Sequence, residues 1–121
     1  MKTGTITIGS VRKEKGKTMT IEEKNRLYDQ LYERFGIRGQ IMQTLEEFAE
    51  LQKEMSKWYR GMPDVDAIAE EIADVEIMLD QIKYFLDIPE ELIREKTDKK
   101  LVRTMERYGS PGDPGKQEGM G

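Results

Sequence analysis

The chain has 121 residues, of which 36% are hydrophobic and 36% are charged, and its formal net charge is −4 at pH 7. This composition fits one small domain of helices with narrow apolar stripes that self-association completes. Cysteine and histidine are both absent, which excludes disulfides, zinc–thiolate sites, thiol nucleophiles and imidazole bases. Any metal must be held by carboxylates, carbonyls and water, which favours Mg²⁺, Mn²⁺ or Ca²⁺.

The charges are distributed unevenly along the chain. Residues 64–87 contain eight acids and one base, whereas residues 1–20 contain five bases and one acid. Because an acidic centre repels phosphate backbones, we expect no stable nucleic-acid binding. No apolar run reaches membrane-spanning length, and the first residues lack the apolar centre of a signal peptide. We therefore expect a soluble, cytoplasmic protein that does not contact membranes.

The first predicted element is a basic N-terminal arm, residues 1–19, which is extended or disordered. In the sequence "TIEE", Thr20 and Glu23 form a capping box, the signature of a helix start. The helix that follows should end near Phe35, because the two glycines of "GIRG" (residues 36–39) favour a break.

Three further helices are predicted after this break. The second covers residues 40–59 and ends at "RGMPD", the third covers 66–86, and the fourth covers 89–108 with a proline in its first turn. Five glycines and two prolines in residues 109–121 indicate a disordered tail. The fold class is therefore all-α, with a four-helix domain over residues 20–108.

Acidic pairs border the apolar stripes of the second and third helices. Glu47 and Glu54 border the first stripe, and Glu50 lies one step further round the helix. Glu71 and Asp74 lie beside the second stripe, since residues three apart project about 60° apart on a helix. If the two helices are antiparallel, both pairs face one cleft, where divalent cations would offset the repulsion. The stripes are Ile41, Leu45, Phe48, Leu51, Met55 and Trp58 in the second helix and Ile68, Ile72, Val75, Leu79, Ile82 and Leu86 in the third.

An ordinary solvated helix face remains the alternative for any single glutamate. For the two pairs together this alternative weakens, because "EEIADVEIMLD" contains no lysine or arginine to form the usual salt bridges. A di-iron carboxylate bundle needs histidine, and an EF-hand needs an aspartate-rich loop with a central glycine. Neither pattern is present.

The sequence "EEFAEL" (46–51), followed by "EEIADVEIML" (70–79), resembles the Glu-Glu-x-x-Glu … Glu-x-x-Asp signature of the MazG-like, all-α nucleoside triphosphate pyrophosphohydrolases. The preceding "GQIMQTLEE" and the later "REKTDKKLVRTMERYG" are also similar to small bacterial and phage members. The resemblance covers roughly Gln40 to Tyr108. Each half of the signature is common alone, and the two halves in order, twenty residues apart, make it specific.

The resemblance implies Mg²⁺-dependent hydrolysis of a nucleoside triphosphate to the monophosphate and pyrophosphate, with Mn²⁺ as a possible substitute. It implies Glu47, Glu50, Glu71 and Asp74 as metal ligands, with Glu46 orienting the attacking water or facing solvent. It also implies a homodimer or homotetramer. The reaction needs charge neutralisation and an aligned water rather than a protein nucleophile, so a chain without cysteine or histidine is able to catalyse it.

Two further features are candidates for substrate contacts. Basic residues recur along one stripe of the fourth helix, and Lys96, Lys100 and Arg103 are our candidates for binding phosphate, with a solvated basic face as the alternative. Trp58 is a candidate for stacking on the base, with helix packing or a subunit contact as the alternative. Ile77 and Tyr84 lie opposite the main stripe of the third helix, which predicts that this helix packs against a second subunit.

Two other functions are compatible with this sequence. One is a non-catalytic helical interaction module whose acids form only a solvated face. The other is a nucleotide sensor of the same fold that binds without turnover. The base and the sugar of the nucleotide are not determined by these residues.

Overall fold

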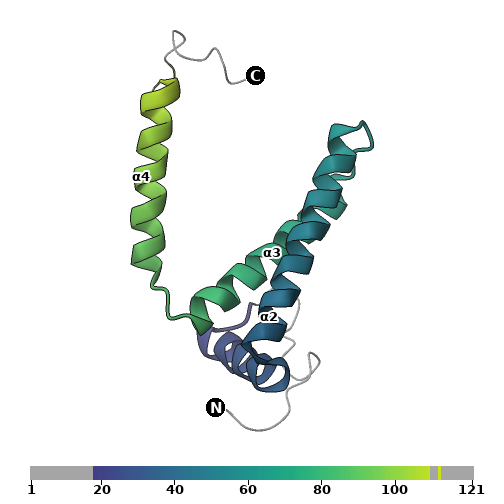
Figure 1. Cartoon of the computed structure of the whole chain (residues 1–121), viewed down its shortest axis with the longest axis vertical. Coiled ribbons are helices and arrows are strands. Elements are labelled where there is room, and N and C mark those ends of the chain that lie inside the picture. Colours follow the sequence, from purple (N-terminus) through teal and green to yellow (C-terminus); the bar gives the residue numbers. More distant parts are fainter. Residues whose placement is uncertain (1–17, 110–111, 113–121) are drawn as a thin grey trace. The chain divides into compact units, whose positions relative to one another are not determined.

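The computed structural model describes residues 18–109 and 112. Residues 1–17 of the predicted arm (1–19) and most of the predicted tail lie outside the described residues. Within these residues the chain forms three helices, α2, α3 and α4, and no strand (Figure 1). The all-α prediction is confirmed. Tertiary contacts divide the chain into two units, Met1–Asp87 and Ile88–Gly121, which are described separately.

Helix α2, Ile21–Tyr59, begins at the predicted capping box. The Thr20 hydroxyl accepts a hydrogen bond from the Glu23 amide at 3.0 Å, and the Thr20 amide donates to the Glu23 carboxylate at 2.8 Å. Two of the amide groups left without partners at the helix start are satisfied in this way. The prediction of this helix start is confirmed.

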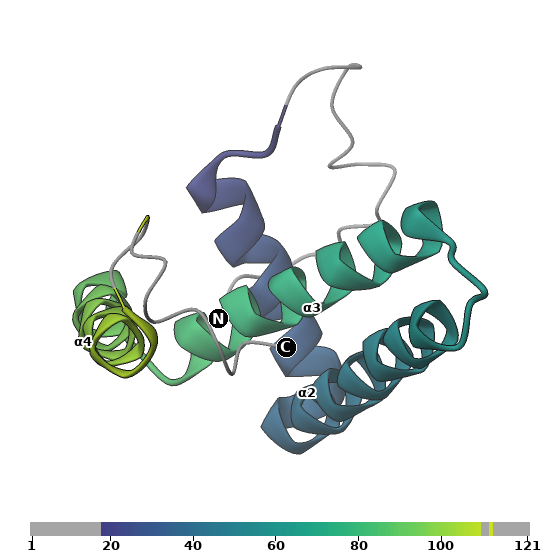
Figure 2. The same ribbon diagram turned by 90° about the horizontal axis from the view of Figure 1, so that it is seen from above.

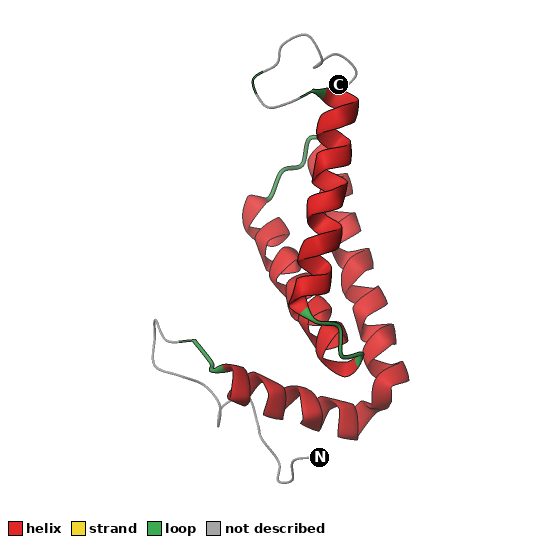
Figure 3. Ribbon diagram, turned by 90° about the vertical axis from the view of Figure 1, so that its left-hand side faces the viewer, coloured by secondary structure: helices red, strands yellow, loops and turns green. Residues whose placement is uncertain are grey.

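A kink at Gly36 divides α2 into a first arm and a second arm (Figure 3). Gly36 has φ 75° and ψ 167°, a conformation almost restricted to glycine because a Cβ atom strains it. The break predicted within "GIRG" is confirmed at Gly36, but it is confined to that residue, because the helix resumes directly after it. Gly39 lies inside the second arm, where a glycine costs only about 1 kcal/mol relative to alanine.

Helix α3, Val65–Phe85, runs beside the second arm of α2 (Figure 2). The Asp64 side chain caps it by accepting a hydrogen bond from the Ala67 amide at 3.0 Å. After the helix ends, Asp87 takes a φ of 54°, a left-handed conformation that aspartate tolerates better than most residues. The short connection through Gly61 and Pro63 makes the two helices antiparallel, which is the arrangement that the shared acidic cleft requires.

The first arm of α2 is fastened to α3 by two hydrogen bonds between tyrosine and aspartate. The Tyr28 hydroxyl donates to Asp80 at 2.7 Å, and the Tyr84 hydroxyl donates to Asp29, also at 2.7 Å. Lys24 forms an ion pair with Asp80 at 3.6 Å. The rings of Tyr28 and Tyr84 also contact each other, with their centroids 5.9 Å apart. These contacts hold the kinked arm against α3.

The buried core of the described residues is small and largely polar. Tyr28 and Met78 are its buried apolar side chains, and Gln40, Thr44 and Gln81 are its buried polar ones. By contrast, much of the predicted apolar stripe of α2 faces outward: Leu45 is 53% exposed and Phe48 is 40% exposed. The stripe is therefore not the face that packs on α3 within this unit.

Helix α4, Glu90–Tyr108, has Pro89 at its N-cap, one residue before the position expected from the sequence. It has no buried residue. The Lys99 ammonium pairs with Glu95 at 3.3 Å, one turn apart on the helix surface. None of the helices in residues 18–109 combines the length and the apolarity needed to cross a membrane.

Candidate metal centre

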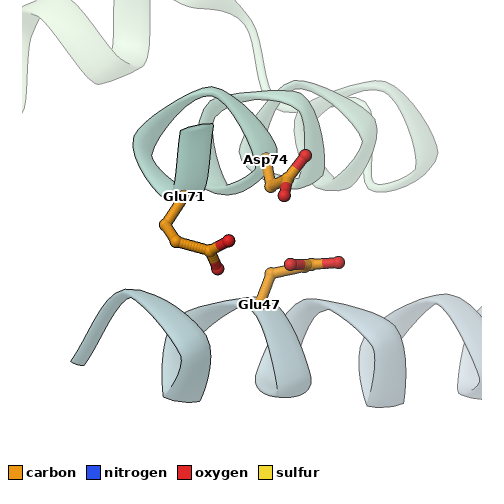
Figure 4. A group of neighbouring side chains, drawn as sticks. All are labelled: Glu47, Glu71 and Asp74. Atoms are coloured by element: carbon orange, nitrogen blue, oxygen red, sulfur yellow. The ribbon is translucent and has the colours of Figure 1, made fainter. Parts of the chain in front are cut away.

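Three carboxylates meet between the second arm of α2 and α3. Glu47 projects from α2, and Glu71 and Asp74 project from α3 (Figure 4). One oxygen atom from each of these residues lies within 4.8 Å of the other two. We call this group the acidic centre. Its members come from both halves of the paired acidic motif, so the fold brings the two halves together.

The helical spacing explains how these side chains converge. Glu71 and Asp74 are three residues apart on α3, so they share one side of that helix. On α2, the Gln43 amide group donates a hydrogen bond to the Glu47 carboxylate at 2.8 Å from one turn earlier. This bond restrains the side chain of Glu47 beside the two acids of α3.

Two carboxylate oxygens near this centre are buried and have no hydrogen-bond partner: Oε2 of Glu71 and Oε1 of Glu54. The other oxygen of Glu54 pairs with the Lys57 ammonium at 3.4 Å. A buried carboxylate oxygen without a partner loses its hydration and gains nothing in return. Such an oxygen is what a bound cation would satisfy.

The charge at the centre acts most strongly on Glu71. Burial raises the pKa of its carboxyl group above the usual value, and repulsion from Asp74, Glu50, Glu47 and Glu54 raises the pKa further. Each of these causes disfavours the ionised form. Without a cation, the acidic centre therefore holds Glu71 in an environment that opposes its negative charge.

The residues present fit a hard divalent cation. Glu47, Glu71 and Asp74 offer carboxylate oxygens from two rigid helices, and oxygen is the ligand atom that Mg²⁺ and Mn²⁺ prefer in proteins. Mg²⁺ usually takes one or two carboxylates and keeps waters and substrate oxygens as its other ligands. A cluster of three carboxylates leaves room for such ligands.

The structure brings three of the four predicted metal ligands together. Glu50 is exposed and outside the cluster of three, although its charge reaches Glu71. Glu46 is also exposed and outside it. Glu54 was expected on the same flank as Glu47 but was not among the predicted ligands. The signal was its position seven residues after Glu47, which on a helix differs by only about 20° in direction.

The remaining candidates lie elsewhere. Lys96, Lys100 and Arg103 are exposed on α4, in the second unit, and their binding of phosphate stays a prediction. Trp58 is 54% exposed in the last turn of α2, and base stacking by Trp58 also stays a prediction. Comparison with protein families, with curated proteins and with solved structures found no match to this chain.

Proposed function

We propose that this chain is a Mg²⁺-dependent nucleoside triphosphate pyrophosphohydrolase of the MazG-like type, and that Mn²⁺ can replace Mg²⁺. One observation carries the proposal: carboxylates from both halves of the resembling motif converge within 4.8 Å. The buried, unpartnered oxygen of Glu71 supports it, because Glu71 belongs to the same group.

In the proposed site, Glu47, Glu71 and Asp74 hold the metal, and Glu50 completes the ligand set through a change of side-chain rotamer. Mg²⁺ at this position supplies charge neutralisation of the triphosphate and acidification of a water molecule. Gln43 keeps the Glu47 carboxylate oriented through its 2.8 Å hydrogen bond. Glu46 orients the attacking water or faces solvent, as expected from the motif.

The positively charged stripe of α4 is the proposed partner for phosphate. Lys96, Lys100 and Arg103 recur on one side of this helix and are fully available to a ligand, since each is exposed. Cationic side chains at this spacing can bind successive phosphate oxygens or the departing pyrophosphate. In this proposal the stripe of α4 binds the triphosphate or the departing pyrophosphate.

Self-association is part of the proposal, with four helical segments per chain completing a bundle in a homodimer or homotetramer. It is supported by the exposed apolar side chains of α2 and α3, which include Leu45, Phe48, Ile77 and Leu79, all at least 40% exposed. Exposed apolar surface of this extent is typical of a face that packs on another protein. A small polar core is also marginal for a monomer.

The direct test is hydrolysis. The chain is incubated with Mg²⁺ and a panel of ribo- and deoxyribonucleoside triphosphates, and both pyrophosphate and the nucleotide product are measured. We expect monophosphate and pyrophosphate from at least one nucleotide. The Glu71→Gln variant should lose at least about a hundredfold in kcat/KM, because even groups that only orient metal ligands cost 10- to 100-fold when mutated.

Glu70→Gln is the matched control, since Glu70 is the exposed neighbour of Glu71 and its substitution removes the same charge. It should retain activity close to that of the unmodified chain. Equal rates for the two variants across the whole panel, or diphosphate as the product, contradict the proposal.

The second candidate is a non-catalytic helical interaction or nucleotide-sensing module of the same fold. The extent of exposed apolar surface on α2 and α3 favours it, because that surface fits protein binding without any chemistry. Nucleotide binding without hydrolysis, measured by calorimetry in the presence of Mg²⁺, selects the sensor. Absence of both metal and nucleotide binding selects the interaction module.

A further inference from the structure

A cavity lies between the kinked region of α2 and α3, one turn of α2 before Glu47 of the acidic centre. Its volume is about 330 Å³, at the small end of the range for small-molecule sites. Leu31, Phe35 and Met78 supply apolar walls, while three glutamines, Gln40, Gln43 and Gln81, supply side-chain carboxamides. We call this cavity the carboxamide pocket.

Two of these glutamines are held in fixed positions. Gln40 is 5% exposed and Gln81 is 3% exposed, and the Gln40 amide group donates to the Gln81 oxygen at 2.6 Å. The Gln81 amide group also contacts the Met78 sulfur at 3.7 Å. A carboxamide has two donor hydrogens and an acceptor oxygen with two lone pairs. The pair therefore keeps unused donors and acceptors that are already oriented by packing.

The absence of a side chain at Gly39 keeps one wall of the pocket open. Gly39 lines the cavity, and a Cβ atom added there would lie 3.1 Å from the Phe35 Cβ. A larger residue would push the aromatic ring or fill the space beside it. The pocket thus combines flat apolar surface with fixed amide groups, which is the combination that binds a planar heterocycle with polar edges.

Gln43 connects this pocket to the acidic centre. It lines the pocket and donates its 2.8 Å hydrogen bond to Glu47. Gln40 precedes Glu47 by seven residues, which is about 10 Å along the helix axis. One ribose and its first phosphate groups can bridge such a length, with the phosphates at the acidic centre and the base beside Gln40.

We propose that the carboxamide pocket binds the nucleobase of the substrate, and that Gln40 and Gln81 read the hydrogen-bonding edge of that base. This inference rests on the proposed function and adds the element that determines its specificity. A carboxamide presents a donor and an acceptor side by side, which matches a base edge with an adjacent acceptor and donor. The volume suits the base alone, so the ribose and phosphates extend towards Glu47.

The pocket and Trp58 are two alternative binding positions for the base. Along α2, Gln40 lies two turns before Glu47, whereas Trp58 lies three turns after it. A base bound in the pocket and a base stacked on Trp58 would therefore lie on opposite sides of the acidic centre. The pocket is favoured because it is a cavity with buried polar groups, whereas Trp58 is 54% exposed.

The test measures binding, separately from turnover. Nucleoside 5′-(α,β-methylene)triphosphates of the five common bases, which resist cleavage at that bond, are titrated into the full chain with Mg²⁺ by calorimetry. Inorganic tripolyphosphate is the probe without a base. We expect at least one analogue to bind about tenfold more tightly than tripolyphosphate, the gain from one or two well-placed hydrogen bonds.

The decisive variant is the double substitution Gln40→Met/Gln81→Met. It removes both carboxamides and keeps their size, and replacing both partners of a buried hydrogen bond is less disruptive than replacing one. It should remove the tenfold preference for the analogue and leave tripolyphosphate binding unchanged. Gln52→Met, at an exposed position of the same helix, is the matched control and should keep the preference.

Two results overturn the inference. One is that no analogue binds more tightly than tripolyphosphate. The other is that Trp58→Leu removes the preference while the double variant keeps it. If the double variant does not fold, NMR of the unmodified chain decides instead, because the side-chain amide signals of Gln40 and Gln81 must shift when the preferred analogue is added. Hydrolysis of the triphosphate panel is measured independently, so the proposed function can survive the loss of this pocket.

Discussion

The two ends of the α2–α3 contact differ in chemistry. At the kinked end, tyrosine hydroxyls donate hydrogen bonds to aspartates and one glutamine donates to another. At the end nearer the connecting loop, carboxylates lie beside other carboxylates. Tyr28 donates to Asp80, and Gln40 donates to Gln81. At the other end, Glu71 faces Glu47 and Asp74, and one of its oxygens is buried without a partner. At the kinked end each of these polar groups therefore has a partner on the other helix, whereas at the other end a carboxylate oxygen has none.

This difference distinguishes polar groups that already stabilise the fold from carboxylates whose charges a bound cation would neutralise. Buried hydrogen bonds with matched partners contribute to stability and fix the helices relative to each other. Clustered carboxylates without matched cations oppose folding, and their retention requires another benefit. In this chain we assign that benefit to metal and substrate binding.

The largest expected effect comes from adding a divalent cation. Mg²⁺ or Mn²⁺ at 100 times its dissociation constant should raise the free energy of unfolding by about 2.7 kcal/mol, because the folded state alone offers the assembled ligands. Thermal unfolding with and without EDTA measures the shift. Glu47→Gln should abolish most of it, while Tyr84→Phe, at the kinked end, should leave it intact. A metal-independent melting temperature would contradict the assignment.

A second experiment alters the kink itself. Gly36→Ala should lower the free energy of unfolding by about 1–3 kcal/mol, because φ 75° and ψ 167° are strained for any residue with a side chain. A Cβ atom added to Gly36 meets no other atom within 4 Å, so the cost is conformational and not a steric clash. Urea unfolding followed by circular dichroism measures it. Increased stability would mean that a straight α2 is the better-folded form.

A third, smaller effect concerns the hydrogen bonds that hold the first arm. Tyr28→Phe should cost about 1.5 kcal/mol, the lower range for a hydrogen bond to a charged group, since it leaves Asp80 with Lys24 as its partner. Denaturant unfolding detects a change of this size. Tyr59→Phe is the control because Tyr59 is 86% exposed. Equal stability of both variants would show that the Tyr28–Asp80 bond contributes nothing net.

The sequence predicts the helices well because their ends depend on local chemistry. The Thr20–Glu23 capping box and the Asp64 cap are each satisfied within a few residues, so no tertiary information is needed to place them. The extent of the break after Phe35 was not predictable in this way. A glycine permits a kink without requiring one, and the packing of the first arm on α3 decides the outcome.

The faces of the helices were predicted less well than their ends. Periodicity shows that Leu45 and Phe48 share a side of α2, but it does not show which partner covers that side. Within the described unit, the side with Gln40, Thr44 and Glu47 packs on α3 instead. Glu47 and Glu50 differ by about 60° in direction around the axis of α2. This difference explains why the Glu47 carboxylate lies in the acidic centre and the Glu50 carboxylate does not.

The last prediction concerns the pH dependence of the free energy of unfolding, which should differ between the two ends of the α2–α3 contact. Because Glu71 has a raised pKa, the folded metal-free chain binds more protons than the unfolded chain above the ordinary glutamate value of 4.5, so stability falls as pH rises from there. Solvent screening of this partly exposed group makes the effect small. Glu71→Gln should remove it, and saturating Mg²⁺ should reverse it, since the metal binds the ionised form.

At the kinked end, stability also falls as the pH rises, but it does so in the alkaline range. The hydrogen bond to Asp29 raises the pKa of Tyr84 to about 12, together with burial and the negative charges of Asp29 and Asp87. Its contribution is complete below the ordinary value of 10 and is lost as pH rises through about 12. Denaturant unfolding of Tyr84→Phe against pH should show a smaller alkaline loss, because Tyr28, whose pKa is also raised by burial and by Asp80, still contributes to it. The fall in stability above pH 4.5 should be unchanged. If one substitution changed the pH dependence of stability in both the Glu71 range and the Tyr84 range, the two ends would be coupled rather than independent.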